Sequence, residues 1–506
     1  MTVQTGPGTG PGNTNHHGKT GSPGTLARAD VVIVGGGPAG IAAAVAAARN
    51  GASTLLLEQY GCLGGMMTVG LVMPFSAYSS RSGKSFGGIM EEMRRQTLRL
   101  TREYAAGEGD DEQVCSSPHV LKYVALDLVI KSGAKVLFHA MLADVVRNGD
   151  RIESLVVCTK SGLCAIEGDF FIDATGDGDL LARAGEEFVL GSEPGVLASL
   201  TETGLNQIHE TGGHYGEYET SGQLQPASLM FTMGNVNEER AGVFINKRLR
   251  FSDLGLAREA FLRLPYANTP GFVIKDGSDD IPLPQKRVLF FKTRHPGEVV
   301  VNMTRVTGID GTDALQLSNG EVIAQQQTLH LVDFLKRFVP GFENAFLRET
   351  GSVLGVRETR RLIGRHVLTG REAVMCVPFE DVIAHGSYII DIHDPRGQRG
   401  AIGGAIKGDF YDIPWRSLLP KTINNLLVAG RCISADHVAH SSTRIQGTCM
   451  LTGQAAGTAA AIATRESRTV FSDVDAFSIQ SRLLADGVRL QIPRLARPFT
   501  VHQPSV

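Results

Sequence analysis

The chain has 506 residues, of which 42% are hydrophobic and 20% are charged, a composition typical of a globular protein with a large core. Its length suits two or three domains. The formal net charge of -3 argues against a basic surface that binds nucleic acid, and no apolar run approaches the roughly 18 residues of a membrane-spanning helix.

Residues 1–28 are rich in Gly, Pro, Thr and Asn and contain no apolar stretch of the kind found in a signal peptide. This composition predicts a disordered tail. The seven cysteines of the chain are scattered and odd in number, and no CxxC spacing occurs among them. That pattern argues against a disulfide scaffold, a zinc ribbon or an iron–sulfur centre. We therefore expect a cytoplasmic protein, since free thiols persist in a reducing compartment.

A strand, a glycine-rich turn, a helix and a second strand follow one another after the tail. Residues 31–34 are an apolar run typical of a buried parallel strand, and an Ala-rich helix is expected over about 38–49. A second apolar run, 54–57, ends in an acid, Glu58. The turn between the first strand and the helix has the spacing G-x-G-x-x-G. All these parts in register predict a dinucleotide-binding site.

Each residue of this turn has a physical reason. Gly35 permits the tight turn, Gly37 lets the backbone approach a pyrophosphate, and Gly40 lets the helix pack closely on the strand. The helix N-terminus supplies free N–H groups and a positive dipole end. Glu58 can accept hydrogen bonds from ribose hydroxyls, which argues against a 2′-phosphate there. The expected cofactor-binding residues of this unit are Gly35, Gly37, Pro38, Ala39, Gly40 and Glu58.

The next part of the chain predicts helices followed by a small antiparallel meander. Helices are expected over about 88–104 and 118–132, and a strand over 135–138. Alternation of apolar and polar residues predicts the meander strands, 141–147, 152–159 and 163–167. A further strand, 170–173, runs into the turn Ala174-Thr-Gly-Asp-Gly178.

The middle of the chain, about 187–400, is less regular and contains no second strand-GxGxxG-helix unit. It predicts strands at 228–235, 287–293 and 298–303 and an amphipathic helix at about 320–338. A buried strand returns at about 425–430, and a helix over 450–464 follows a Gly/Thr turn.

Several separated segments resemble the glutathione-reductase-like FAD superfamily, and in detail the FAD-dependent oxidoreductase family, relatives of fumarate reductase flavoproteins and heterodisulfide reductase flavin subunits. The segments that carry the resemblance are 30–66 (DVVIVGGGPAGIAAAVAAARNGASTLLLEQYGCLGGM), DATGDGDLLARAG, RETRRLIGRHVLTG, YIIDIHDP, IPWRSLLPKTINNLLVAGRCISADH and TRIQGTCMLTGQAAGTAAA. The resemblance implies an α/β fold. A discontinuous Rossmann-like FAD-binding domain, with a mostly parallel sheet plus a β-meander, would carry an inserted α+β substrate domain. The implied division is a tail (1–28), the first part of the FAD-binding domain (29–188), the substrate domain (189–410), the second part (411–466), and a C-terminal helical segment and tail (467–506).

The resemblance also implies FAD contacts beyond the first turn. Gly64 and Gly65, followed by Met66, resemble the diglycine that passes beside the pyrophosphate and flavin. The remaining implied contacts are Thr175, Gly176, Asp177, Gly430, Arg431, Gly447 and Thr448. At the last turn a helix N-terminus would point at the flavin, where its N–H groups stabilise the negative charge of the reduced ring. The distant turns would have no role at a site for NAD alone, so we expect FAD, with NAD as the alternative. Covalent attachment of the FAD through Cys62 or a histidine stays open.

Candidate proton-handling residues occur in two segments. Asp391 and His393 share one face if their segment is a strand. His437, His440 and Arg444 precede the expected flavin-facing turn. A histidine suits proton transfer because its pKa lies near working pH. The alternatives are a satisfied core histidine or a structural hydrogen bond to the FAD, and His440 departs from the apolar or small residue that the family leads us to expect.

Arginines offer a second kind of chemistry. Arg444, Arg357, Arg360 and Arg361 could bind a carboxylate, since guanidinium is a planar bidentate donor, or could form a buried Arg–Glu pair that braces two domains. No metal site is expected, because Asp391 and His393 lack a convincing third ligand. Cys62 has no second cysteine within 63–80, so a redox dithiol is not expected and Cys62 is interpreted as a small buried hydrophobe.

The sequence thus predicts a FAD-dependent oxidoreductase that transfers a hydride between a small organic substrate (an alcohol, an amine or an activated C–H) and the flavin N5. It would act as a dehydrogenase or oxidase, with His437 or His393 as the base and Arg444 as a further catalytic residue. The alternatives are a flavin monooxygenase or hydroxylase, a fumarate-reductase-like C=C reductase with an arginine as proton donor, and a non-enzymatic electron-transfer subunit. The electron acceptor (oxygen, quinone or protein) and the oligomeric state stay open; a homo-oligomer is compatible with the sequence.

Overall fold

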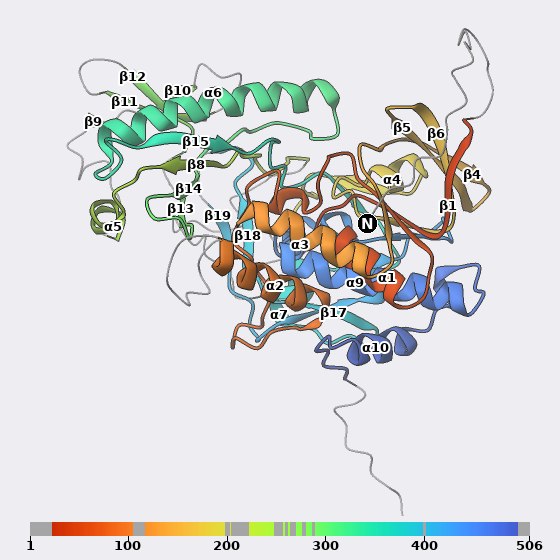
Figure 1. Cartoon of the computed structure of the whole chain (residues 1–506). Coiled ribbons are helices and arrows are strands. Elements are labelled where there is room, and N and C mark those ends of the chain that lie inside the picture. The colour runs from red at the N-terminus through yellow and green to blue at the C-terminus, as the bar shows by residue number, and fades with distance from the viewer. Residues whose placement is uncertain are drawn as a thin grey trace, which may run out of the picture.

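The structure is a computed structural model that describes residues 23–104, 117–197, 203, 222–246, 257–258, 262–263, 270–275, 280–285, 289–397 and 401–493. Most of the expected N-terminal tail, the last residues of the C-terminal tail, part of the middle segment and Cys115 lie outside these ranges. Figure 1 shows a layer of helices around α1 and α9, a twisted β-meander at the right, and a lobe under the long helix α6 at the upper left.

The main sheet confirms the α/β fold. Its neighbouring strands are parallel: β1 (Thr25–Val34), β2 (Thr54–Leu57), β3 (Lys135–Leu137), β6 (Gly162–Asp173) and β21 (Leu426–Val428). In the register of these pairs Val34 lies beside Leu57 and Asp173, and Val428 also lies beside Asp173. The carboxyl ends of the strands therefore meet at one edge, where α/β sheets bind their ligands.

Strand β6 joins the meander to the main sheet. Its first half pairs antiparallel with β5 (Arg151–Thr159), which pairs in turn with β4 (Met141–Asn148). Strand β1 pairs with β6 from Ala165 to Asp173, and β21 pairs with the last three residues of β6. The runs expected as separate strands at 163–167 and 170–173 are therefore one strand of 12 residues. Gly168 lies between them, and a Cβ there would be 2.9 Å from Val32.

The N-terminal tail expected over residues 1–28 extends too far, because its last four residues belong to a strand. Strand β1 begins at Thr25, because residues 25–28 pair with the first half of β6. Arg28 also forms an ion pair with Asp169 (2.7 Å). Thr25 and Arg28 are mostly solvent-exposed, so no apolar run marks this part of the strand in the sequence.

One face of the sheet is covered by helices and the other by the meander. The helices of this layer are α1 (Pro38–Arg49), α2 (Gly88–Tyr104), α3 (Pro118–Lys131) and α9 (Gln446–Arg465). Residues Val31 and Ile33 of β1 pack on the helical side, whereas Val32 and Val34 pack on the meander side. Helix α9 begins four residues earlier than the sequence predicted, at Gln446, and is buried along almost its whole length.

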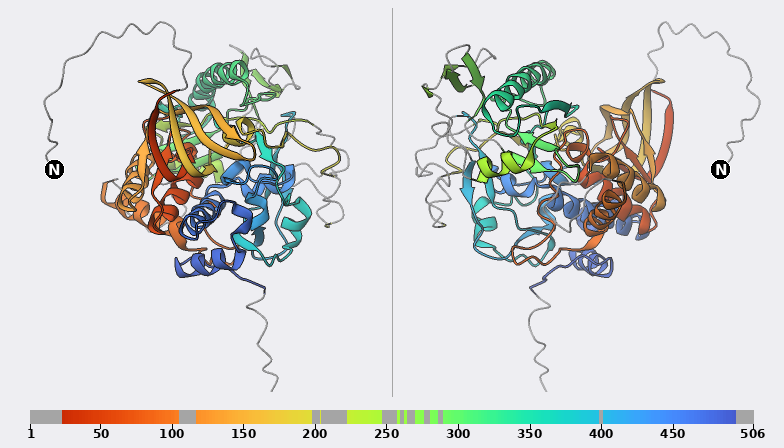
Figure 2. Two further views of the ribbon diagram at one scale, coloured as in Figure 1. Left: turned by 90° about the vertical axis from the view of Figure 1, so that its right-hand side faces the viewer. Right: turned by 60° about the vertical axis from the view of Figure 1, so that its left-hand side comes forward.

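The lobe at the upper left of Figure 1 has its own cores and projects from the rest of the molecule in both views of Figure 2. Its sheet has the order β13-β14-β8-β15. The strands are β8 (Phe231–Gly234), β13 (Leu289–Lys292), β14 (Val299–Asn302) and β15 (Phe346–Thr350). Helix α6 (Ala314–Phe338) packs Leu331 and Phe334 on this sheet. It starts at Ala314, six residues before the expected 320, and the side chain of its N-cap Asp313 accepts from two backbone N–H groups. Outside this sheet the lobe has α5 (Glu238–Asn246), β9 (Ala257–Arg258), β10 (Leu262–Arg263), β11 (Pro270–Lys275) and β12 (Asp280–Leu283).

The cores suggest a narrower substrate domain than 189–410. The lobe's own clusters extend from Ala227 to Leu354, whereas Leu368, Ile383 and Trp415 share a core with α1 and α9. We propose a substrate domain of about 222–355. The elements that return to the main body are β7 (Phe188–Leu190), β16 (Arg360–Leu362), α7 (Gly370–Met375), β17 (Val382–Gly386), β18 (Ile390–His393), β19 (Ala401–Gly404), β20 (Tyr411–Pro414), α8 (His437–Thr443) and α10 (Ala476–Ala485).

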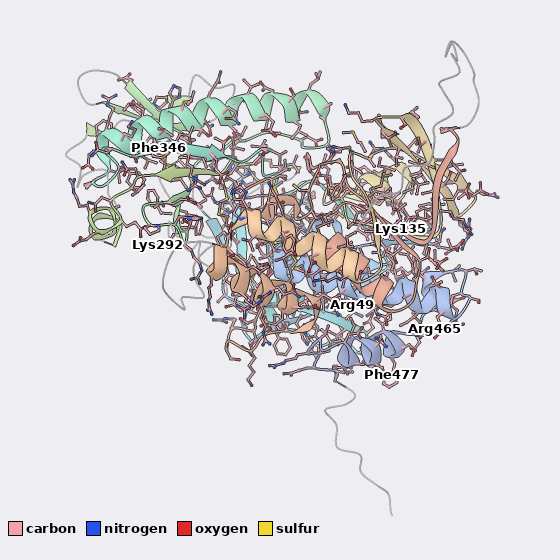
Figure 3. All side chains as sticks on the ribbon, viewed as in Figure 1. Arg49, Lys135, Lys292, Phe346, Arg465 and Phe477 are labelled. Atoms are coloured by element: carbon pink, nitrogen blue, oxygen red, sulfur yellow. The ribbon has the colours of Figure 1, made fainter. Side chains whose placement is uncertain are left out.

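The outside of the molecule carries a few large apolar side chains, such as Phe346 on the lobe and Phe477 on α10 (Figure 3). Among the helices that the structure describes, none is long and apolar enough to cross a membrane. The six cysteines within the described ranges are free thiols.

Candidate active site

The first glycine turn combines tight packing with one open position. A Cβ at Gly35 would be 2.5 Å from the carbonyl oxygen of Ala174, and a Cβ at Gly40 would be 1.7 Å from that of Gly35. At Gly37, the N-cap of α1, a Cβ would meet no atom within 4 Å. Gly35 and Gly40 are therefore required by the fold, whereas the space beside Gly37 is available to a ligand at the N-terminus of α1.

Glu58 lies under this turn and is 4% exposed. Its carboxylate accepts hydrogen bonds from the backbone N–H groups of Gly36 (2.7 Å) and Tyr60 (2.8 Å). Burial raises the pKa of Glu58 despite these bonds. Each carboxylate oxygen keeps a further lone pair, so the side chain can still accept from a ribose hydroxyl.

The diglycine loop lies against the first turn. Gly64 and Gly65 have φ values of +113° and +50°, and a Cβ at Gly65 would be 3.0 Å from the Cα atom of Gly37. Met66 follows, and its sulfur lies 3.7 Å from the position of a Cβ at Gly355. The loop thus links the open side of the first turn to the edge of the substrate domain.

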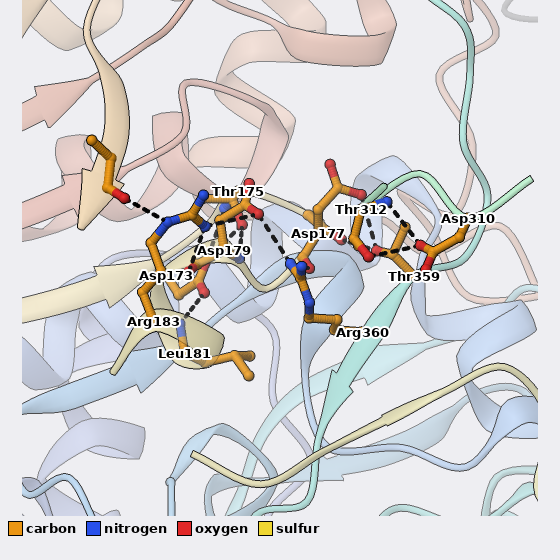
Figure 4. Close-up of polar contacts among 12 residues, drawn as sticks. Asp173, Thr175, Asp177, Asp179, Leu181, Arg183, Asp310, Thr312, Thr359 and Arg360 are labelled. Carbon is orange, nitrogen blue, oxygen red and sulfur yellow. Dashed lines mark hydrogen bonds and ion pairs between the residues drawn. The ribbon is translucent and has the colours of Figure 1, made fainter. Parts of the chain in front are cut away.

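The turn after β6 is shaped by Asp173, which is fully buried (Figure 4). Its carboxylate accepts from the backbone N–H (3.0 Å) and hydroxyl (2.7 Å) of Thr175 and from the backbone N–H of Leu181 (2.8 Å). Burial raises the pKa of Asp173 to about 6. Gly176 follows with a φ of +79°, in the left-handed region that favours glycine.

Arg431 connects this turn to the end of β21. Its guanidinium donates to Asp177 (2.7 Å) and to Thr359 (3.2 Å), and Thr359 itself donates to Asp177 (2.9 Å). The neighbouring Gly430 has a φ of +82°, and its Cβ would lie 2.8 Å from that of Ala39 in α1. The expected contacts of the second and third turns are thus brought to the N-terminus of α1.

At the start of α9, one of the N–H groups that the resemblance places opposite the flavin already has a partner. The backbone N–H of Gly447 donates to the carbonyl oxygen of Ser76 (3.1 Å). A Cβ at Gly447 would be 2.3 Å from the carbonyl oxygen of Ala77. Thr448 is fully buried, and its hydroxyl has no hydrogen-bond partner among the described residues. At this turn the Thr448 side chain is therefore the better candidate for a ligand contact.

Helix α8 presents His437, His440 and Arg444 at spacings of three and four residues, which places them on one face. Its N-cap Asp436 accepts from the backbone N–H groups of Ala439 (2.7 Å) and Gly370 (2.8 Å). Both histidines are fully buried. The atoms of this face that have no hydrogen-bond partner among the described residues are His437 Nε2, His440 Nδ1, His440 Nε2 and Arg444 Nε.

A buried charged cluster orients His437. Its Nδ1 lies 2.8 Å from Glu358, which also pairs with Arg361, and Arg361 donates to Glu193 (2.6 Å). Burial opposes the charge of Glu358, yet His437 and Arg361 hold its pKa well below the usual range. Arg361 is therefore in the buried Arg–Glu arrangement that was one of its two alternatives, and Arg360 pairs with Asp179 (3.0 Å) near the second turn (Figure 4).

Strand β18 and Arg444 form a second cluster. His393 Nε2 lies 3.4 Å from Asp391, and Arg444 Nη2 lies 3.5 Å from the same carboxylate. Burial and the charge of Arg357 lower the pKa of His393 to about 3. Burial opposes ionisation of Asp391, but His393, Arg444 and Arg357 hold its pKa below the usual range.

Sequence reasoning missed three residues that join these parts. Thr359 braces Asp177 and Arg431. The side-chain oxygen of Gln225 accepts from the backbone N–H of His393 (3.1 Å), and the backbone N–H of Gln225 donates to the carboxylate of Glu358 (3.3 Å). Glu358 and Thr359 lie inside the motif RETRR, which could have pointed to them, whereas nothing local marks Gln225. Cys62 contributes to neither cluster, and among the described residues no group of three or more His, Cys, Asp or Glu is placed to hold a metal ion.

These features fit FAD. The open side of Gly37, the diglycine loop beside it and the unpartnered side chains of α8 and α9 offer a cradle and hydrogen-bonding groups to a bound cofactor. Comparison with known families decides the matter, because residues 30–483 match the family described as FAD dependent oxidoreductase. The chain belongs to this family.

Curated relatives of this FAD-dependent oxidoreductase include two archaeal kinds of enzyme. A thiamine thiazole synthase of Methanococcus vannielii is 30% identical over 202 residues, which are 36% of this chain and 70% of that protein. A digeranylgeranylglycerophospholipid reductase of Methanocaldococcus jannaschii is 30% identical over 128 residues, 24% of this chain and 31% of that protein.

Solved structures with a similar arrangement have low sequence identity. A geranylgeranyl bacteriochlorophyll reductase-like protein of Thermoplasma acidophilum is 14% identical with a TM-score of 0.39, covering 91% of this chain and 84% of that chain. A myxobacterial chondrochloren halogenase is 12% identical with a TM-score of 0.41, covering 90% of this chain and 78% of that chain.

Proposed function

We propose that this oxidoreductase removes a hydride and a proton from a small organic substrate, as a dehydrogenase or oxidase. FAD, when bound, supplies the acceptor for the hydride. The observation that carries the proposal is the row of buried, unpartnered polar atoms along α8 and at Thr448 in α9. Each such atom costs about 1–3 kcal/mol if it stays without a partner, so a bound ligand that meets these atoms would remove that cost.

In this proposal the cofactor lies along the carboxyl edge of the sheet. The pyrophosphate would take the open side of Gly37 and the N-terminus of α1, and a ribose would bind Glu58. The loop of Gly64 and Gly65 would lead toward Thr448, where the side-chain hydroxyl can donate or accept.

His437 is the base that we propose. A carboxylate only accepts hydrogen bonds, so Glu358 holds the neutral imidazole in the form that has its proton on Nδ1. Nε2 then carries the lone pair and takes the proton of a substrate O–H or N–H. Arg361 balances the charge of Glu358, so the carboxylate orients the ring without having to take up the proton itself.

A flavin monooxygenase and a C=C reductase are the alternative reactions. A monooxygenase would need reduction by NAD(P)H, and a C=C reductase would run hydride transfer in the opposite direction. The similarity to thiamine thiazole synthases covers 36% of this chain, so we do not extend their activity to it.

An anaerobic substrate screen tests the proposal. Purified protein that is yellow and bleaches with an alcohol, an amine or a hydroxy acid would agree with it, whereas bleaching only with NAD(P)H would favour the monooxygenase. With an active substrate, His437→Gln should slow bleaching by about 100-fold or more, the usual loss for a general base. His119→Gln, at an exposed position of α3, is the matched control and should bleach at the wild-type rate. A colourless protein that binds no added FAD would overturn the proposal.

A further inference from the structure

Positive charge is concentrated where the substrate domain meets the main body. Arg305 follows β14, Arg357 precedes β16, and Arg444 ends α8, so three separate segments contribute. Burial, together with the positive charges of Arg444 and Arg305, lowers the pKa of Arg357 to about 9. Two of the three arginines contact strand β18 or the residue after it: Arg444 Nη2 lies 3.5 Å from the Asp391 carboxylate, and Arg305 donates to the backbone oxygen of Asp394 (3.1 Å).

The negative charge at this point is smaller. Asp391 faces Arg444 and His393 and also acts on Arg357. The backbone oxygen of Asp394 accepts from Arg305 (3.1 Å), and the Asp394 carboxylate accepts from the backbone N–H of Arg396 (3.1 Å). Asp391 thus offsets one of the two positive charges of Arg357 and Arg444, and this pair of guanidinium groups retains a positive charge.

Arg357 and Arg444 also have N–H groups that donate to no acceptor among the described residues. Arg357 donates through Nη1 to Pro226 (2.5 Å) and Ser228 (2.9 Å), and among the described residues nothing accepts from its Nε or Nη2. Arg444 donates through Nη2 to the backbone oxygen of Asp391 (3.1 Å), while its buried Nε has no partner within the described part of the chain. The Nε of Arg444 is buried, and buried donors are normally satisfied, so an acceptor outside the described chain is expected beside it. The Nε and Nη2 of half-buried Arg357 are open to the same acceptor.

The cluster lies at the end of the proposed FAD path that is remote from the pyrophosphate turn. Arg444 directly precedes Ile445, the N-cap of α9. On the other side, Arg357 holds Ser228, which is bridged to Gly355, and the Gly355 backbone lies beside Met66. An anion bound between the two arginines would therefore sit near the residues that we assign to the flavin.

We propose that Arg357 and Arg444, together with His393, bind the carboxylate of an organic-acid substrate. This inference rests on the proposed function and adds the substrate class to it. A carboxylate accepts two parallel N–H bonds from a guanidinium, and Arg357 and Arg444 together carry more positive charge than Asp391 offsets, so the pair suits a carboxylate group. The substrate C–H bond breaks with its electron pair passing to FAD, the oxidant, and the proton of the adjacent O–H or N–H passes to Nε2 of His437.

Binding of inert anions to the oxidised holoenzyme tests this site without turnover. Malonate, its uncharged analogue malonamide, and inorganic phosphate are titrated while the flavin spectrum and the melting temperature are recorded. We expect saturable binding of malonate that weakens with added NaCl, no binding of malonamide, and phosphate binding that is weaker by about tenfold or more. Equal affinity for malonate and malonamide would overturn the proposal, and equal affinity for malonate and phosphate would reassign the cluster to inorganic anions.

Variants locate the binding and separate this inference from the proposed function. Arg357→Gln and Arg444→Gln should each weaken malonate binding by about tenfold or more, Arg357→Lys should keep part of it, and Arg465→Gln, on the exposed end of α9 (Figure 3), should change nothing. FAD content, read from absorbance, checks that each variant is folded. Unchanged affinity in folded Arg357→Gln would overturn the carboxylate site. Malonate binding without reduction by any substrate would overturn the proposed function alone.

Discussion

Gly453 of α9 lies so close to Ala39 of α1 that a Cβ at position 453 would be 2.1 Å from the carbonyl oxygen of Ala39. Gly457 has the same relationship to Ala43, again at 2.1 Å. The two helices can approach this closely only because small residues face each other at both points. Since α1 begins at the first glycine turn and α9 follows Arg444, this contact sets the distance between the two ends of the candidate site.

Gly453→Leu should separate the helices. Overpacking in a core costs about 1–3 kcal/mol and more where backbone must move, so we expect a lower urea midpoint and loss of bound FAD. Gly242→Ala in α5 is the control, because a Cβ there meets no atom within 4 Å. Wild-type stability of Gly453→Leu would contradict the packing that we describe.

Gly37 and Gly40 should respond differently to alanine. Gly37 has φ -74° and ψ -172°, which alanine adopts, and its Cβ would point into open space. Gly37→Ala should therefore keep the stability of the FAD-free protein but weaken FAD binding by about tenfold or more, because the methyl group occupies the space of the pyrophosphate. Gly40→Ala should unfold the protein or lower its melting temperature strongly. Fluorescence titration of FAD and thermal melts of the apoprotein measure the two effects.

His440→Leu should stabilise the protein when FAD is absent. Both ring nitrogens of His440 are buried without a partner among the described residues, and burial lowers its pKa well below the usual value. Replacing these polar atoms by an apolar side chain removes a penalty of about 1–3 kcal/mol. We expect a higher melting temperature of the apoprotein and a smaller rise on adding FAD and malonate. A lower apoprotein melting temperature would show that the ring is already satisfied.

Asp173 should give the protein a pH-dependent stability. Its pKa is raised from 3.8 to about 6 by burial, so the folded state favours the protonated form. The stabilisation is complete below pH 3.8 and is lost as the pH rises toward 6. In Asp173→Asn the slope of unfolding free energy between about pH 4 and pH 6 should become smaller, and the part due to Asp436, whose pKa burial also raises to about 6, should remain. Asp169→Asn, at an exposed position, is the control and should keep the slope.

His393 should affect substrate binding rather than the pH dependence of catalysis. Burial and Arg357 lower its pKa to about 3, so the ring is neutral throughout the range of about pH 5–8. We expect His393→Gln to raise the substrate concentration needed for half-maximal flavin reduction while the shape of the pH–rate profile stays the same. Loss of an inflection from that profile would instead identify His393 as the base.

Local sequence patterns were sufficient for much of the fold. The glycine turn, its flanking strands and the helix over 38–49 are fixed by short-range periodicity and turn chemistry, and the structure has them at the expected residues. The predicted strand boundaries are wrong where pairing with a distant strand sets the length of a strand. Residues 25–28 become strand because β6 extends beside them, and Gly168 continues a strand although its composition predicts a break.

The candidate site shows the same division. The family motifs brought attention to His437, His393 and Arg444, and their roles stay predictions. The fixing of His437 by Glu358 depends on residues 79 positions apart in the chain, and the link through Gln225 depends on residues separated by more than 130 positions. No periodicity records such contacts, because they arise only when β18, α8 and the segment before β16 come together.

The sequence by itself determined the strand, glycine turn, helix and second strand of the unit for which it predicts dinucleotide binding, since the glycine spacing and strand ends are local features of the backbone. Only the tertiary structure decided which polar side chains are satisfied. It showed that Arg361 is neutralised by Glu358, that the N–H of Gly447 is already used by Ser76, and that His440, Arg357 and Arg444 keep unused donors or acceptors. The physical reason is that a hydrogen bond or an ion pair depends on the distance between groups in space, and the folded chain alone sets that distance.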